Sequence, residues 1–142
     1  MPTFIVKLTD KDGIDYYLLW CSITDAPRCA GLRLDDFVRQ YNLTHDPATL
    51  AERMQRVQAK GTSALEYDSV LDLIIPNRAG PHECCLSYDE LIRFYCHGEV
   101  ADPNSSCWSL RRDKTARILE EKRDMSSGDL EGIFNQFPYV VC

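Results

Sequence analysis

The chain has 142 residues, of which 44% are hydrophobic and 27% are charged, and it carries a formal charge of −6. This length predicts one domain over residues 1–142, and no apolar run reaches the ~20 residues of a membrane-spanning helix. The negative charge opposes non-specific binding to nucleic acid or to an anionic membrane, so we expect a protein partner. The start of the chain lacks a secretion signal and the seven cysteines match no disulfide framework, which predicts a cytoplasmic protein with free thiols.

The first 21 residues predict a β-hairpin. Residues 3–9 alternate between two faces, residues 10–13 have the composition of a turn that ends in glycine, and residues 14–21 are rich in aromatic side chains. Both faces of the second strand are apolar, so we expect it to be covered on both sides or to use one side for binding. A hairpin alone is not stable, and helices or another strand must pack against it.

A ten-residue pattern occurs twice and predicts two amphipathic helices. Residues 32–41 and 86–95 both read Leu, any, apolar, Asp, acid, apolar, apolar, Arg, any, Tyr. In the second copy, Ser87 and Glu90 have the spacing of a capping box, which satisfies two backbone N–H groups at a helix start. The core faces predicted from helical spacing are Leu34, Phe37, Val38 and Tyr41 in the first copy and Tyr88, Leu91, Ile92 and Tyr95 in the second.

Each copy is followed by an Asp-Pro pair and by a further predicted helix. Asp46 and Pro47 begin a helix that Gly61 ends, because Pro suits the first helical position and Gly suits the residue after the last. A charged helix is predicted from about residue 106 to residue 124, beyond the second Asp-Pro pair. Residues 32–61 and 86–124 are therefore a candidate pseudo-repeat, and two ordinary core helices are the alternative.

The remaining segments complete an α+β prediction. Residues 69–75 fit either a short helix, which we prefer, or a buried strand, and Pro76 ends both. A short helix is expected after Asp129, and residues 139–142 are a candidate closing strand. The chain thus predicts a mostly helical α+β domain in which an N-terminal β-hairpin packs with five or so helices.

Candidate metal ligands flank the second copy of the pattern. They are His82, Cys84, Cys85, Cys96 and His97. The helix between Cys84 and Cys96 would separate its two ends by ~15 Å, which is too far for one tetrahedral zinc ion. We therefore predict no metal site and no cofactor. No cysteine has the surroundings of a catalytic nucleophile. A cysteine- or metal-dependent enzyme is the least favoured alternative.

A helix-turn-helix nucleic-acid binder is the second alternative. Residues 34–58 fit two helices joined by a turn, and basic side chains follow both copies of the pattern. The residues that would contact nucleic acid are Arg53, Arg56, Arg111, Arg112, Lys114 and Arg117. Acidic residues are interleaved with these, and i, i+4 ion pairs explain the charge pattern equally well.

Two surface features are candidates for binding another protein. Tyr16, Tyr17 and Trp20 are residue types that anchor interfaces, although the same types also fill cores. An open edge of the hairpin would allow a partner strand, or a second copy in a homodimer, to pair with it. Asn77 and Arg78, in the loop before the second copy, are the other predicted partner-binding residues.

Several short stretches resemble small accessory proteins of bacteriophages and prophages. They are Tyr16–Ser22, Asp25–Pro27, Gly61–Ser63, Asn77–Pro81 and Tyr95–Cys96, so the resemblance covers roughly residues 4–98. It implies a phage-encoded, non-enzymatic protein that binds a host protein and modulates or inhibits it, as an inhibitor of a defence system does. It transfers no catalytic residue to this chain.

Overall fold

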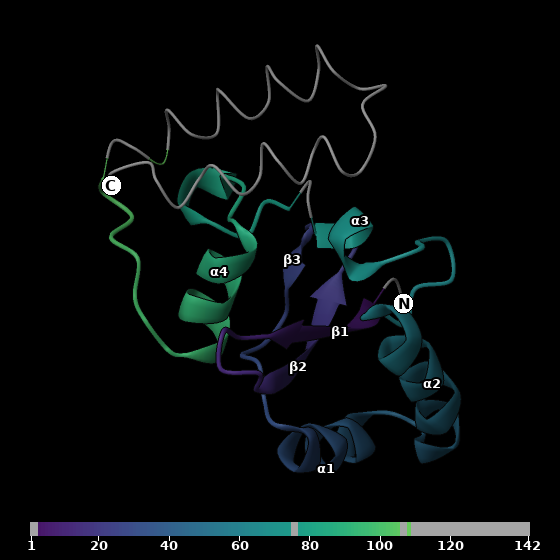
Figure 1. Ribbon diagram of the computed structural model, residues 1–142. Coiled ribbons are helices and arrows are strands. Elements are labelled where there is room, and N and C mark those ends of the chain that lie inside the picture. Colours follow the sequence, from purple (N-terminus) through teal and green to yellow (C-terminus); the bar gives the residue numbers. More distant parts are fainter. Residues whose placement is uncertain (1–2, 75–76, 106–107, 109–142) are drawn as a thin grey trace.

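The computed structural model describes residues 3–74, 77–105 and 108 and contains a three-stranded antiparallel sheet (Figure 1). The strands β1 (Thr3–Thr9) and β2 (Asp15–Cys21) form the predicted hairpin, and their register pairs Phe4 with Trp20. A two-residue strand that was not predicted, β3 (Ala26–Pro27), pairs with β2. The α+β class is confirmed.

The hairpin turn is organised by the side chain of Asp10. Its Oδ1 accepts hydrogen bonds from the N–H groups of Asp12 and Ile14, both at 2.9 Å. Gly13 has φ +81°, a left-handed conformation that side chains disfavour. The predicted turn is therefore present, with Asp10 accepting the backbone N–H groups and Gly13 adopting the left-handed conformation.

Both outer edges of the hairpin pair with other parts of the same chain. Ser63 donates its N–H to the Ile5 carbonyl at 3.0 Å and accepts from the Ile5 N–H through its hydroxyl at 2.8 Å. On the opposite edge, Tyr17 and Leu32 exchange two backbone hydrogen bonds of 2.7 and 2.8 Å. The open edge that strand addition or edge-to-edge dimerisation requires is thus occupied at these positions.

Four α-helices lie in the described part of the chain, fewer than predicted. Their bounds are α1 (Leu34–Thr44), α2 (Leu50–Lys60), α3 (Val70–Ile74) and α4 (Tyr88–Leu91). The shorter turns are the 3-10 turns η1 (Pro47–Thr49) and η2 (Pro81–Glu83) and the π-helical turn η3 (Ile92–Cys96), which continues α4. The helix predicted for residues 106–124, the one after Asp129 and the strand at 139–142 lie outside the described residues. No helix in the described ranges is long and apolar enough to cross a membrane.

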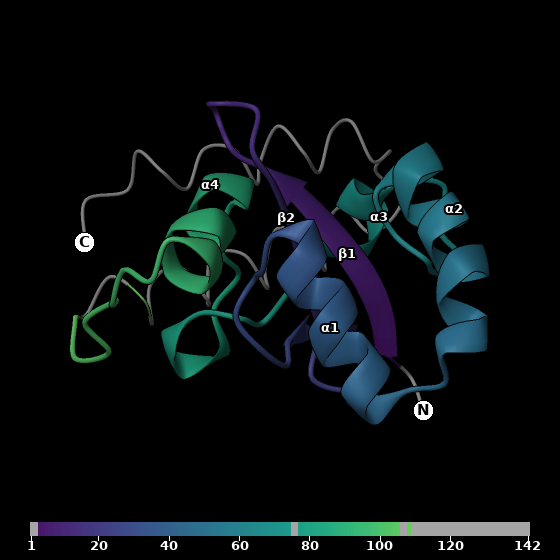
Figure 2. The same ribbon diagram turned by 90° about the horizontal axis from the view of Figure 1, so that it is seen from below.

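The helices form a layer on each face of the sheet (Figures 1 and 2). On one face, α1 and α2 cover a cluster whose buried residues are Ile5, Tyr17, Phe37, Tyr41 and Val57. On the other face, α3 and α4 cover a larger cluster that includes Val6, Leu18, Trp20, Leu73, Leu86, Leu91 and Trp108. The prediction that β2 is covered on both sides is confirmed, and the two copies of the pattern lie on opposite faces.

The core face predicted for the first copy is wrong at its first position. Leu34 is 41% exposed, whereas Phe37 and Tyr41 are buried. Leu34 is the first residue of α1, and it lies beside Gly13 and Asp15 near the hairpin turn. The sheet does not extend far enough there to cover it.

The two Asp-Pro pairs adopt matching turns. Asp46 accepts the Ala48 N–H through Oδ1 at 2.9 Å, and Asp102 accepts the Asn104 N–H in the same way at 2.9 Å. The N–H groups three residues after each Asp, in Thr49 and Ser105, donate to the Asp carbonyls. The pseudo-repeat of residues 32–61 and 86–124 remains a prediction, because the segment that would match α2 lies outside the described ranges.

Candidate functional site

The aromatic residues of the hairpin are mostly in the core. Trp20 is fully buried, and Tyr17 is 3% exposed with its hydroxyl accepting a hydrogen bond from Gln58 at 3.0 Å. Tyr16 is half-buried, and its ring lies edge-on against the His97 ring with 5.6 Å between centroids. The partner-binding prediction is therefore wrong for Trp20 and Tyr17, whose rings fill the two faces of the sheet.

Asn77 is also an internal structural residue. It is 1% exposed, and its amide donates to the carbonyls of Ile74 at 2.7 Å and Leu86 at 2.8 Å. Its Oδ1 accepts the N–H of Leu86 at 2.9 Å and that of Ala79 at 3.2 Å. Because these bonds join the loop after α3 to the strand-like segment before α4, Asn77 is not available to a partner.

Arg78 stays at the surface, as predicted. Its guanidinium lies 3.6 Å from the Asp25 carboxylate, and its backbone N–H donates to the Asp25 carbonyl. This contact brings the loop that contains Arg78 beside the β2–β3 turn, where Ile23 is 70% exposed. Arg78 thus belongs to a mixed polar and apolar surface at one end of the sheet.

The candidate metal ligands have separate partners. His82 Nε2 lies 2.7 Å from the Pro103 carbonyl oxygen, and His97 Nε2 lies 3.3 Å from Asp10 Oδ2. Cys84 is buried, and Cys96 packs against Gly31. Within residues 3–74, 77–105 and 108, no three His, Cys, Asp or Glu side chains are grouped so that they could hold a metal ion.

The cluster of Asp10, Cys96 and His97 contains the residue types of a thiol-based catalytic site. Burial, together with the negative charge of Asp10, raises the pKa of the Cys96 thiol to about 12. The thiol is therefore neutral at ordinary pH, whereas a cysteine nucleophile must be a thiolate. The Asp10 carboxylate instead links the hairpin turn to the end of η3 through His97.

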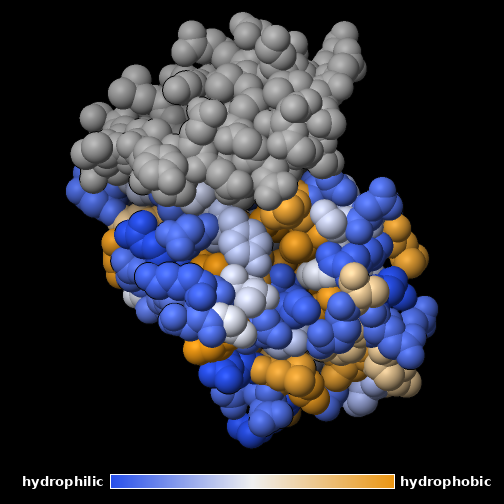
Figure 3. All heavy atoms as spheres, viewed as in Figure 1, coloured by the Kyte–Doolittle hydropathy of each residue, from blue (hydrophilic) through white to orange (hydrophobic). Residues whose placement is uncertain are grey.

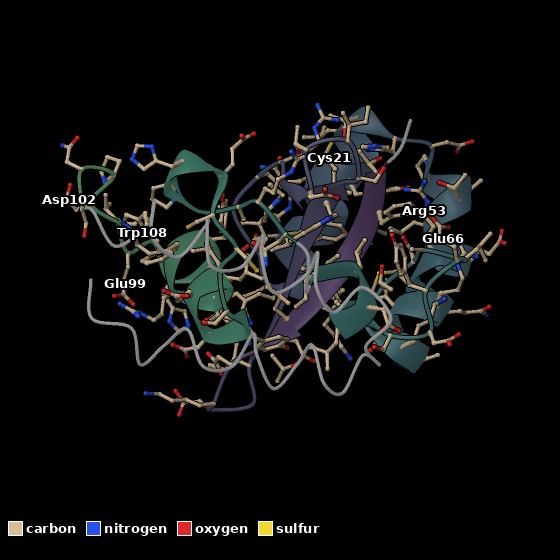
Figure 4. The ribbon with its side chains drawn as sticks, turned by 90° about the horizontal axis from the view of Figure 1, so that it is seen from above. Cys21, Arg53, Glu66, Glu99, Asp102 and Trp108 are labelled. Carbon is tan, nitrogen blue, oxygen red and sulfur yellow. The ribbon has the colours of Figure 1, made fainter. Side chains whose placement is uncertain are left out.

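Two of the basic residues considered for nucleic-acid binding are part of internal contacts. Arg53 donates to the Tyr41 hydroxyl at 3.1 Å, and Arg56 donates to the Ser63 carbonyl at 2.8 Å while pairing with Glu52. In Figure 4, Arg53 lies on the α2 side of the molecule, and Asp102 and Trp108 lie on the opposite side. The other four, Arg111, Arg112, Lys114 and Arg117, lie outside the described residues.

An apolar groove lies between α1 and the segment that joins β3 to α1, and we call it the α1 groove. Its volume is about 320 Å³, and its lining residues are Leu19, Cys29, Ala30, Leu32, Phe37, Gln40, Tyr41 and Thr44. Leu32 pairs with Tyr17 on the edge of β2, and the residues before it, Cys29 and Ala30, line the groove with small side chains. Cys29 and Ala30 are exposed, so the groove opens to solvent.

An exposed leucine borders the α1 groove. Leu43 is 78% exposed and lies three residues from Gln40, which places the two side chains next to each other on the helix surface. Figure 3 shows apolar side chains at the surface over α1. This site was not predicted from the sequence, and the available signal was Leu43 itself, a large apolar residue off the buried face of the predicted helix.

No protein-family model, no curated protein and no solved structure matches the chain.

Proposed function

We propose that this protein binds another protein by docking an apolar segment of that partner in the α1 groove. The observation that carries the proposal is the solvent-open groove of about 320 Å³, lined mainly by apolar side chains and bordered by the exposed Leu43. Recognition sites of this kind combine a concave apolar surface with a few polar groups, here Gln40 and Thr44. The role is that of a binding protein and needs no cofactor.

The concrete form of the proposal is a phage-encoded protein that modulates or inhibits a bacterial host protein, such as a defence-system component, in the cytoplasm. The resemblance of residues 4–98 to phage accessory proteins supports this choice of partner. Residues 109–142 carry equal numbers of acidic and basic residues, so the net charge of −6 lies in the first 108 residues. This negative charge favours a specific contact with a protein over a contact with nucleic acid.

The test fills the groove while leaving the fold unchanged. In Ala30→Trp, an indole at an exposed lining position occupies the space that a partner side chain would enter. Ala59→Trp is the matched control, because Ala59 is exposed on α2 and is not a lining residue of the groove. Each variant is expressed in bacterial cells and crosslinked there, and the captured proteins are compared by quantitative mass spectrometry.

The expected result is a stoichiometric partner that the wild type and Ala59→Trp capture equally and that Ala30→Trp loses by about tenfold or more, which corresponds to one hot-spot contact. Equal capture by all three proteins would show that the groove is not the docking site. Circular dichroism and thermal melting confirm that both variants are folded.

A further inference from the structure

Arg28 lies at one end of the α1 groove, and no carboxylate in the described part of the chain pairs with it. Its backbone N–H donates to the Leu19 carbonyl at 2.8 Å, and both Leu19 and the next residue, Cys29, line the groove. Four other arginines in the described ranges, Arg39, Arg56, Arg78 and Arg93, each form an ion pair with Asp or Glu. Among the same residues, no Asp or Glu side chain lies within ion-pair distance of Arg28, which is exposed.

The positive charge of Arg28 also acts on the neighbouring thiol of Cys21. Cys21 lies two residues from Leu19 on β2 and therefore faces the same side of the sheet. Hydrogen bonds from Thr24, the backbone N–H of Ile23 and the positive charge of Arg28 lower the pKa of the Cys21 thiol. The Arg28 charge is the smallest of these contributions, and it is the one that a carboxylate in the groove would also meet.

The rest of the groove adds no negative charge from the residues that the structure describes. None of the described lining residues is acidic. The nearest acidic residue along α1 is Asp36, which precedes Phe37 and forms an ion pair with Arg39 at 3.4 Å. The groove thus has an apolar body and a positive end, although the chain as a whole is acidic.

We propose that the segment docked in the α1 groove carries an acidic residue directly beside its apolar anchor, with the apolar side chain in the groove and the carboxylate at Arg28. This inference rests on the proposed function and specifies the chemistry of the partner. It runs against the net charge of −6, which by itself would favour a basic partner. The net charge favours a positively charged ligand, whereas Arg28 favours a negatively charged one. Comparing two ligands of opposite charge therefore separates these expectations.

The probes are 4-phenylbutyrate and 4-phenylbutylamine, which share an apolar body and differ in the sign of the charged end. Each is titrated into the ¹⁵N-labelled full chain at low ionic strength, and binding is followed by amide shifts of residues 28–32 and α1. We expect the acid to bind about threefold more tightly than the amine, as one exposed ion pair allows. Added salt should reduce the difference, because the pair at Arg28 is exposed.

Two variants assign the effect to the groove and to its charge. Arg28→Gln should bring the two affinities together, and Ala30→Trp should abolish the shifts caused by both probes. An amine that binds as tightly as the acid would overturn the carboxylate assignment while leaving the groove as a docking site. Groove shifts with neither probe would overturn this inference, and the crosslinking comparison would then decide the proposed function separately.

Discussion

The helices α1 and α4 begin with the same residue pattern and yet are held in different ways. At the start of α4, Ser87 and Glu90 form the complete capping box, with hydrogen bonds of 3.0 and 3.2 Å. At the start of α1, the N-cap residue is Arg33, whose side chain makes no capping bond, and Leu34 is 41% exposed. A repeated apolar pattern therefore does not produce an equally anchored helix.

The two faces of the sheet explain the difference. Among the described residues, the cluster under α4 has twelve buried members, and the cluster under α1 and α2 has five. Asn77 joins the loop after α3 to the segment that leads into α4, whereas one flank of α1 borders the solvent-open α1 groove. The α1 groove lies on the face with the smaller cluster, and the following substitutions test this contrast from the largest expected effect to the smallest.

Asn77→Ala should be the most damaging change on the α4 face. It removes four side-chain hydrogen bonds to backbone groups and leaves the buried N–H and carbonyl of Leu86 without their partner. Each unsatisfied buried group costs about 1–3 kcal/mol, so we expect the free energy of unfolding to fall by about 3 kcal/mol. Urea denaturation measures this loss, and Asn42→Ala, at an exposed position of α1, is the control that should change little. A loss below about 1 kcal/mol would show that the loop does not depend on Asn77.

Exchanging the caps tests the two helix starts directly. Ser87→Ala should lower the free energy of unfolding by about 1 kcal/mol or somewhat more, because the Glu90 N–H loses its acceptor in a buried position. Arg33→Ser should raise it by about 0.5–1 kcal/mol, because Arg33 already has the extended conformation of an N-cap residue, with φ −65° and ψ 158°. Thermal and urea unfolding give both values. Changes of opposite sign in the free energy of unfolding would support the difference between the two helix starts, and a destabilising Arg33→Ser would contradict it.

Local signals explain what the sequence could predict. The capping residue Ser87 and the glycines at the hairpin turn and the end of α2 act on their immediate neighbours, and these features are present where expected. Gly61, for example, has φ +87° and donates its N–H to the Val57 carbonyl, as a residue that ends a helix does. Asp46 caps the 3-10 turn η1 instead of the α-helix predicted there, and α2 begins at Leu50.

The features that escaped prediction depend on contacts between distant segments. β3 forms because the chain reverses at Asp25, which has φ +52°, and the turn composition of Asp25–Pro27 does not predict that Ala26 and Pro27 then pair with β2. The α1 groove requires Leu19, the Cys29–Leu32 segment and α1 to lie together, and no periodicity encodes that arrangement. The aromatic side chains misled the site prediction for the same reason, since the second layer of helices that buries Trp20 comes from residues 70 and beyond.

The Asp10–His97 contact joins the hairpin turn to the end of η3. The Asp10 carboxyl also predicts that stability depends on pH. The Ile14 N–H, in the first place, and His97 lower the pKa of the Asp10 carboxyl below its ordinary value of 3.8. The folded chain then binds fewer protons than the unfolded chain, so this stability is present above that value and is lost as the pH falls through the lower, folded pKa. Asp10→Asn should therefore flatten the fall of the urea midpoint between pH 5 and the acid limit, and an unchanged slope would contradict this role.

Replacing Leu43 should have the smallest effect on stability, and its expected effect is on partner binding. Leu43 and Leu65 are 78% and 76% exposed, so replacing either by Ser should change the free energy of unfolding by less than about 0.5 kcal/mol. Only Leu43 borders the α1 groove, so Leu43→Ser should weaken capture of the crosslinked partner by several-fold while Leu65→Ser leaves it unchanged. If both variants bind like the wild type, the contact surface does not extend from the groove to this part of α1. If both weaken binding equally, the partner recognises exposed leucines across the acidic surface. The smaller buried cluster under α1 would then be unrelated to binding.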